Sequence, residues 1–135
     1  MASPLDTLAQ HASGFDELYG LELLEHEEGR ISGRVAVRPE VCQPYGLVHG
    51  GLYASVAEAL ASLGTAAAVS EEGKTAVGLS NATSFMRPIT AGFVNAVAVA
   101  VHRGRSTWVW DVEFTDDSGR RCAMTRMTIA VRERA

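Results

Sequence analysis

Hydrophobic positions near the start of the chain follow two different spacings. Over residues 1–20 the large apolar side chains recur at roughly helical intervals, and Gly14 interrupts the pattern. Residues 21–26 and 31–37 are two short extended stretches, separated by the turn sequence Glu28-Gly29-Arg30. We therefore expect a helical lead-in followed by a β-hairpin.

The middle of the chain is apolar on almost every side. Residues 51–69 contain no proline and are rich in alanine, the strongest helix former. An all-round apolar helix is expected where other protein surrounds it. In the segment before it, Pro39, Pro44 and Gly46 break periodic structure. A loop therefore leads into one long central helix.

The second half of the chain alternates between apolar and polar residues. Extended segments are expected at residues 75–86, 93–102, 107–114 and 121–131, with intervening turn sequences suited to antiparallel connections. In the third segment, Trp108 and Trp110 fall on one face, where they would pack against the helix or a neighbouring subunit. These segments predict a β-meander, and the whole chain, residues 1–135, an α+β single domain with a sheet around one helix.

Composition narrows the class of protein. With 135 residues and 47% hydrophobic content the chain can bury one sizeable core. A net charge of -4 argues against non-specific nucleic-acid binding. Cys42 and Cys122 are too few for a disulfide framework and lack the spacing of a zinc site, so no metal is expected. Without a signal sequence or a run of about 18 uncharged apolar residues, we expect a cytoplasmic protein with no membrane partner.

A polar stripe runs along the predicted helix. Gly51, Ser55, Glu58 and Ser62 stand at i, i+4, i+7 and i+11 and fall on one face. Burying the Glu58 carboxylate there costs several kcal/mol unless it is compensated, and its small neighbours leave room for a ligand. Alternatively, Glu58 lies on a solvent-exposed edge of the helix, as most helical glutamates do. Spacing alone leaves these two readings equal.

The start of the predicted helix offers a second candidate feature. Gly50 and Gly51 permit close backbone approach, and free N–H groups at the positive end of the helix dipole suit a developing oxyanion. The alternative is that both glycines serve only a tight turn. His49 could orient the loop or a carbonyl, or simply cap the helix. Gln43, in the preceding loop, could reach a ligand carbonyl or be an ordinary exposed residue.

Basic residues gather at predicted strand ends and near residue 135. Their guanidinium groups could hold the phosphates of a nucleotide, although ordinary surface charge is the alternative for each. The candidates are Arg87, Arg103, Arg105, Arg132 and Arg134. No strand-linked GxGxxG, Walker, HExxH, GxSxG or kinase motif is present, so the acid/base groups reduce to Glu58 and the histidines.

The sequence from Gln43 to Gly51, followed by Glu58, resembles the motif of hotdog-fold thioesterases. It is most similar to two groups of them, the 4-hydroxybenzoyl-CoA thioesterases of the Arthrobacter type and the PaaI-like acyl-CoA thioesterases. The resemblance extends through residues 76–81, 83–88 and 107–112 to residue 132. It implies a hotdog fold, an antiparallel sheet wrapped around one long central helix. It also implies a homo-oligomer, a dimer with active sites at its interface and a dimer of dimers as homotetramer.

The same resemblance implies roles for individual residues. The Gly50 N–H polarises the thioester carbonyl, Gln43 assists its binding, and His49 shapes the loop. Ser62 occupies the position of a hydroxyl that helps to place water, where the Arthrobacter-type enzyme has threonine. Serine is also found there in the related 1,4-dihydroxy-2-naphthoyl-CoA thioesterases.

Residues expected to bind substrate and coenzyme A follow from the resemblance too. Arg87 matches the arginine that contacts CoA phosphate, and Arg132 or Arg134 stands in for a second one. Ser106 matches small hydroxyl residues near the far end of the ligand, whereas the neighbouring Arg105 departs from the pattern. Gly51 and Thr107 complete the expected set.

These observations lead to one main hypothesis, an acyl-CoA thioesterase that hydrolyses an aromatic, 4-hydroxybenzoyl-CoA-like substrate. Glu58 acts as nucleophile or general base and Gly50 as oxyanion donor. Coenzyme A is part of the substrate, and no cofactor is expected. Alternative substrates are 1,4-dihydroxy-2-naphthoyl-CoA and phenylacetyl or medium-chain acyl-CoA. A hotdog hydratase or dehydratase and a non-catalytic acyl-CoA binding module are the alternatives from other classes.

Overall fold

The computed structural model describes residues 4–134, so the first three residues of the expected lead-in and Ala135 lie outside the described residues. The helices are α1 (Pro4–His11), α2 (Phe15–Tyr19) and α3 (Gly50–Val69), with short 3-10 turns η1 (Pro39–Val41) and η2 (Ser70–Glu72). The strands are β1 (Glu22–Glu27), β2 (Arg30–Ala36), β3 (Lys74–Phe85), β4 (Phe93–Arg103), β5 (Thr107–Thr115) and β6 (Arg121–Glu133).

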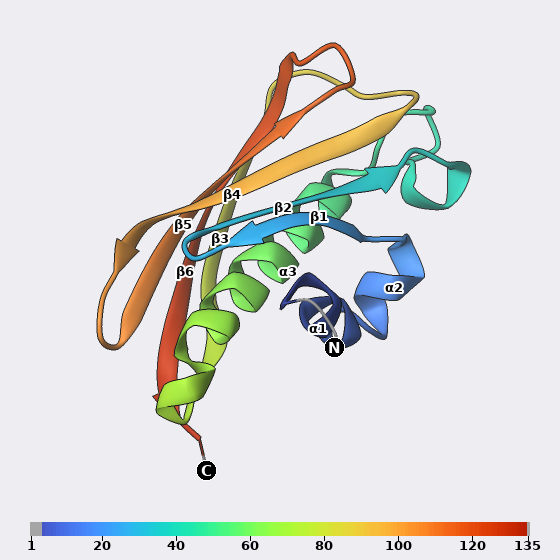
Figure 1. The fold of residues 1–135 in the computed structure, drawn as a ribbon. Helices are drawn as coiled ribbons and strands as arrows, with labels where there is room; N and C mark the ends of the chain where they lie inside the picture. Colours follow the sequence, from blue (N-terminus) through green and yellow to red (C-terminus); the bar gives the residue numbers. More distant parts are fainter. Residues whose placement is uncertain (1–3, 135) are drawn as a thin grey trace.

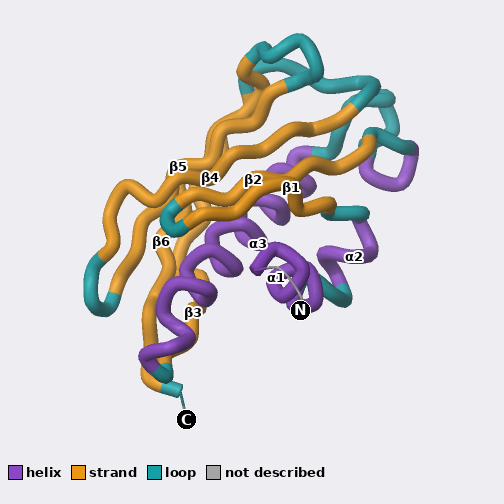
Figure 2. Tube along the Cα trace, viewed as in Figure 1, coloured by secondary structure: helices purple, strands orange, loops and turns teal. Residues whose placement is uncertain are grey.

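One curved sheet wraps around α3, as Figure 1 shows. Its six strands are antiparallel to their neighbours and follow the order β1-β2-β4-β5-β6-β3. The helices α1 and α2 lie beside α3 on the same side of the sheet (Figure 2). The expected α+β layers, the lead-in broken at Gly14 and the β1–β2 hairpin are therefore confirmed.

The position of β3 corrects the expected meander. Strands β4, β5 and β6 pair consecutively, but β3 pairs with β6 at the edge of the sheet instead of with β4. The connection from β3 to β4 is anchored in the core and does not form a hairpin turn: Ile89 is buried, and its carbonyl accepts a hydrogen bond from the Val48 N–H at 2.9 Å. This anchor ties the end of β3 to the segment that precedes α3.

Large side chains of β5 fill the space between sheet and helix. Trp110 is fully buried, and its Nε1–H donates to Oγ1 of Thr65 at 2.8 Å. The helix carries Gly64 beside this ring, where an added β-carbon would stand 2.6 Å from the indole. The predicted packing of the β5 rings against the helix is confirmed, and it fixes the rotation of α3 on the sheet.

The core helix is unusually long and apolar. By length and composition alone, the segment Gly50–Glu72 is apolar enough to cross a bilayer. The sequence predicted no run of about 18 uncharged apolar residues, and that prediction holds only because the charged Glu58 interrupts this segment. More than half of its most apolar stretch is buried inside the protein. The core helix of a globular domain has the same composition, and the packing of α3 against the sheet accounts for it here.

Candidate active site

The start of α3 is held by His49. The His49 backbone is extended, with φ -64° and ψ 134°, and its Nδ1 accepts a hydrogen bond from the Gly51 N–H at 2.8 Å. The His49 N–H donates to the Val41 carbonyl at 2.9 Å. Of the roles considered for His49, the structure shows helix capping, which fixes the loop and the helix relative to each other.

Gly50 leaves its backbone donor available. Within residues 4–134 the Gly50 N–H donates no hydrogen bond, whereas that of Gly51 is used by His49. A β-carbon at Gly50 would stand 3.0 Å from Cζ of Phe85, which is tighter than ordinary contact. The glycine therefore allows close approach of the ring and presents a free N–H at the positive end of α3.

A pocket of ≈ 450 Å³ opens beside this N–H, and we call it the Gly50 pocket. Its walls include Gln43, Gly50, Tyr53, Phe85 and Arg87. The Gln43 Oε1 accepts from the Tyr45 N–H at 2.7 Å, and the amide NH₂ of Gln43 has no partner among the described residues. Three residues expected from the sequence, Gln43, Gly50 and Arg87, thus meet in one place.

Tyr53 is a wall of the Gly50 pocket that the sequence did not point out. Its ring packs edge-on against Phe114 at 5.2 Å and tilted against Phe85 at 5.8 Å. Burial raises the pKa of Tyr53 to about 12, with smaller contributions from the nearby Cys122 and Cys42. The hydroxyl therefore stays protonated at neutral pH and can serve only in hydrogen bonding.

The polar stripe of α3 lines a second pocket of ≈ 610 Å³, which we call the Glu58 pocket. Ser55, Glu58 and Ser62 come from the helix, and Asn81 comes from β3. The lead-in closes the other side with His11, Phe15 and Asp16. Three members of the expected stripe thus line one pocket, whereas Gly51 lines another. In the single chain Glu58 is exposed, as in the alternative reading, and its carboxylate lies against Gly78 of β3.

Asn81 and Asp16 were also missed from the sequence. The Asn81 Nδ2 donates to the Ala54 carbonyl at 2.9 Å, and its Oδ1 accepts from the Thr83 hydroxyl at 2.7 Å. Asparagine is disfavoured in strands, and that was the one signal for it. Burial raises the pKa of Asp16, and the Tyr19 hydroxyl donates to its Oδ1 at 3.0 Å. Helical spacing in the lead-in carried no sign of this pair.

The two pockets are separate within one chain. Gly50 and Glu58 are eight residues apart on α3, which at 1.5 Å per residue is about 12 Å along the axis. Neither residue lines the pocket of the other. One thioester carbonyl therefore cannot contact both groups of the same chain.

The remaining expected binding residues lie elsewhere. Ser106 and Val131 are joined by a hydrogen bond of 2.9 Å, so the β4–β5 turn and the end of β6 meet. This region lies near the C-terminal end of α3, away from Gly50 (Figure 1). Five expected binding residues belong to this region and line none of the pockets around Gly50, Glu58 and His49 of the same chain: Arg105, Ser106, Thr107, Arg132 and Arg134. Among residues 4–134, no cluster of three or more His, Cys, Asp or Glu could hold a metal ion.

Comparison with known proteins decides the family. The sequence profile of the thioesterase superfamily matches residues 45–123, which include the start of α3, Glu58 and all of β3. The chain belongs to the thioesterase superfamily. This thioesterase is 35% identical over 121 residues to 1,4-dihydroxy-2-naphthoyl-CoA hydrolase of Listeria monocytogenes, covering 90% of this chain and 98% of the relative. It is 30% identical over 130 residues to the proofreading thioesterase EntH of Cronobacter turicensis, covering 96% and 89%.

Solved structures agree with the fold. A thioesterase from Haemophilus influenzae superposes with a TM-score of 0.90 at 30% identity, covering 98% of this chain and 93% of that one. A variant thioesterase from Pseudomonas aeruginosa gives 0.91 at 29% identity, covering 98% and 96%. The predicted hotdog fold and the prediction of an enzyme of the thioesterase class are confirmed.

Proposed function

We propose that this thioesterase hydrolyses an aromatic acyl-CoA at a site shared by two copies of the chain. The separation of about 12 Å between Gly50 and Glu58 along α3 carries the proposal. The oxyanion donor of one subunit then works with the carboxylate of the other. In this arrangement the Gly50 pocket of one copy faces the Glu58 pocket of the partner subunit.

The edge strand β3 supports such a dimer. It is 12 residues long and lies at the edge of the sheet, where one side of its backbone has no partner strand among the described residues. Its side chains Val77 and Leu79 are 52% and 57% exposed. A long, apolar, open edge is a liability in a monomer and a ready surface for a second strand. We therefore propose pairing of β3 with β3 of a second copy.

The register of that pairing follows from two contacts. Gly50 lies against Phe85 near the end of β3, and Glu58 lies against Gly78 near its middle. In a two-fold antiparallel pair centred between Asn81 and Ala82, Phe85 stands opposite Gly78 of the partner subunit. This centre brings the Gly50 N–H of one copy to the Glu58 carboxylate of the other.

The chemistry follows from the two groups. The Gly50 N–H and the positive end of α3 stabilise negative charge on the carbonyl oxygen. Glu58 either attacks the carbonyl carbon, which expels the CoA thiolate and leaves a mixed anhydride for water to hydrolyse, or removes a proton from an attacking water. Resemblance to the family favours direct attack. Ser62, one turn beyond Glu58, helps to place water, and Gln43 donates to the carbonyl.

Variants of a relative support the choice of residues. A thioesterase from Staphylococcus aureus superposes on this chain with a TM-score of 0.83. In its solved structures, a glutamine and a glutamate fifteen positions apart were each replaced by alanine. Gln43 and Glu58 have the same separation. The substituted residue in the Pseudomonas aeruginosa structure is also a glutamine.

The proposed substrate is an aromatic acyl-CoA, with 4-hydroxybenzoyl-CoA and 1,4-dihydroxy-2-naphthoyl-CoA as first candidates. The Listeria monocytogenes relative, named for the second of these, supports the aromatic class. Arg87 in the Gly50 pocket is suited to a CoA phosphate. Arg105, Arg132 and Arg134 reach CoA only from another subunit, as in the predicted homotetramer. A cytoplasmic location is part of the same proposal.

Thiol release tests the reaction. Purified protein is incubated with 4-hydroxybenzoyl-CoA, 1,4-dihydroxy-2-naphthoyl-CoA, phenylacetyl-CoA and a medium-chain acyl-CoA, with Glu58→Ala as control. We expect turnover of an aromatic substrate that falls by about 10²-fold to 10⁴-fold in Glu58→Ala. Hydration of a 2-enoyl-CoA without thiol release would favour a hydratase, and tight binding without any product would favour a binding module.

Mixing two inactive variants tests the shared site. Glu58→Ala and Gly50→Pro are purified separately, mixed after partial unfolding and refolded together. A two-fold heterodimer contains one site with both intact groups, so activity should return to about a quarter of the wild-type value. If both groups act within one chain, the mixture stays inactive and the dimer-interface site is wrong.

A further inference from the structure

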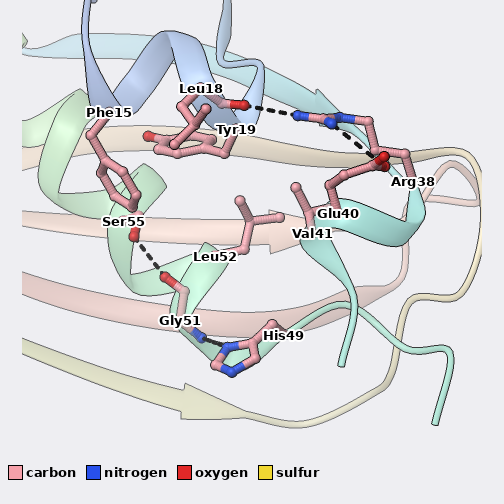
Figure 3. Close-up of a pocket in the computed structure, with 10 residues that line it drawn as sticks. All are labelled: Phe15, Leu18, Tyr19, Arg38, Glu40, Val41, His49, Gly51, Leu52 and Ser55. Carbon is pink, nitrogen blue, oxygen red and sulfur yellow. Dashed lines mark hydrogen bonds and ion pairs between the residues drawn. The ribbon is translucent and has the colours of Figure 1, made fainter. Parts of the chain in front are cut away.

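An apolar pocket adjoins the Glu58 pocket beside the lead-in, and we call it the α2 pocket. It has a volume of ≈ 560 Å³ and lies between α2, η1 and the first turns of α3. Phe15 and Ser55 line both pockets, so they mark the boundary between them. Figure 3 shows Phe15 on the α2 side and Ser55 on the α3 side of this boundary.

Phe15 is not a core residue. It begins α2 directly after Gly14, whose φ of 63° turns the chain into the helix. Its ring is 63% exposed, whereas Tyr19, one turn later, is 6% exposed. The ring packs edge-on against Tyr19 at 5.2 Å. A large apolar side chain held in this way over a pocket is free to meet an apolar ligand.

The lining of the α2 pocket defines the chemistry of its ligand. Leu18, Val41 and Leu52 supply apolar walls. Several of its polar groups already have partners: the Ser55 hydroxyl donates to the Gly51 carbonyl at 2.8 Å, and Arg38 donates to the Leu18 carbonyl at 2.9 Å while pairing with Glu40 at 3.5 Å (Figure 3). With these contacts already made, the pocket suits an uncharged, apolar group.

We propose that the α2 pocket receives the far end of the substrate's acyl group and that Phe15 determines the size of acyl group accepted. This inference rests on the proposed function. An acyl group whose carbonyl meets Glu58 continues past Ser55, one turn nearer the start of α3, and reaches Phe15. A small acyl group ends in the Glu58 pocket, whereas a longer or bicyclic one passes Phe15 into the α2 pocket. The volume of the α2 pocket is within the range of small-molecule sites.

Two opposite substitutions test this assignment. Phe15→Ala opens the boundary, and Leu18→Trp, at a residue that is 74% exposed and lines only the α2 pocket, fills the space behind it. Leu24→Ala, on β1 and 39% exposed, is the matched control because it removes an exposed apolar side chain that lines none of the three pockets. Each protein is assayed with benzoyl-CoA and with saturated acyl-CoA of 6, 8, 10 and 12 carbons.

The expected result is a change in the ratio of kcat/KM for long acyl chains to kcat/KM for short ones. In Phe15→Ala, kcat/KM for the long chains relative to the short ones should rise about tenfold, since one methylene in an apolar pocket is worth tenfold or more. Leu18→Trp should lower the same ratio, and Leu24→Ala should leave it unchanged. Unchanged ratios in both Phe15→Ala and Leu18→Trp would overturn the assignment while leaving the proposed reaction intact.

Binding of S-alkyl-CoA thioethers, which cannot be hydrolysed, separates this inference from the proposed function. Calorimetry with chains of the same lengths should show the same shift in Phe15→Ala, whether or not any thioester is turned over. If the wild-type protein hydrolyses no thioester but Phe15→Ala still shows this shift in affinity, the proposed reaction is refuted and the acyl subsite is kept. Affinities that do not change with chain length in either variant refute the subsite.

Discussion

The Glu58 carboxylate lies so close to the backbone of Gly78 that a β-carbon there would stand 2.6 Å from Oε2. Gly78 belongs to β3, the strand whose pairing shifts register directly after this residue. The glycine therefore creates the space that the carboxylate occupies. Helix α3 and the edge strand together set the position of the proposed catalytic group.

Gly78→Ala should displace this carboxylate without unfolding the protein. The clashing atoms are the far end of a flexible side chain, so the free energy of unfolding should change little. A shift of about 1 Å in a reacting group can lower a rate by about 10²-fold, and we expect kcat to fall by roughly that factor. The low residual rate of Glu58→Ala should not fall further when Gly78→Ala is added. Full activity in the Gly78→Ala single variant would show that the carboxylate position is unimportant.

Gly50→Pro should remove the oxyanion donor alone. Proline is favoured in the first turn of a helix, and the extended His49 backbone is compatible with a following proline. Gly50→Ala is the matched control, because it adds the same contact with Phe85 and keeps the N–H. The kcat of Gly50→Pro should be about 10²-fold to 10³-fold lower than that of Gly50→Ala. Equal rates in the two variants, with helix content verified by circular dichroism, would exclude the Gly50 N–H from catalysis.

Thr65→Val should destabilise the core. The change preserves shape but leaves the buried Trp110 Nε1–H without its acceptor. An unsatisfied buried donor costs about 1–3 kcal/mol, which urea unfolding would measure as a lower free energy of unfolding. In the Trp110→Phe background the same substitution should cost much less. An equal cost in both backgrounds would argue against the hydrogen bond as the cause.

Asp16→Asn should stabilise the protein at neutral pH. Burial raises the pKa of Asp16 above 3.8, so the folded state favours the protonated acid. The stability that the protonated Asp16 contributes to the folded state is complete below pH 3.8 and is lost as pH rises through the raised pKa. Asparagine does not ionise and keeps an acceptor for the Tyr19 hydroxyl. The gain at pH 7 should be under about 1 kcal/mol because the side chain is partly exposed, and it should vanish near pH 3. A gain that is independent of pH would point to another cause.

Much of the fold was predictable because local patterns decide it. Alanine content and the absence of proline predicted α3, and alternation in β5 predicted which face carries Trp108 and Trp110. The place of β3 was not predictable in the same way. Its turn sequences suited a hairpin, but burial of Ile89 and the ladder to β6 depend on residues distant in the chain.

For the site, sequence spacing succeeded along one helix and failed between elements. Spacings of i+4, i+7 and i+11 from Gly51 placed Ser55, Glu58 and Ser62 in one pocket, because helix geometry is fixed. Contacts of Gly78 and Asn81 with α3 arise only from tertiary packing. Phe15 could not be separated from core residues, since a helical spacing does not say which side chain remains uncovered.

The pairing of β3 with β6 also has a consequence for synthesis on the ribosome. Gly78 pairs with Ile129, so the strand that supports Glu58 has no partner until roughly fifty further residues have been made. At about 5–20 residues per second, this edge stays open for roughly 3–10 s, with its apolar side chains uncovered. The strand against which the Glu58 carboxylate lies is therefore completed only when β6, the last strand, has been made. Slow translation between β3 and β6 should therefore expose this protein to aggregation more than a pause elsewhere.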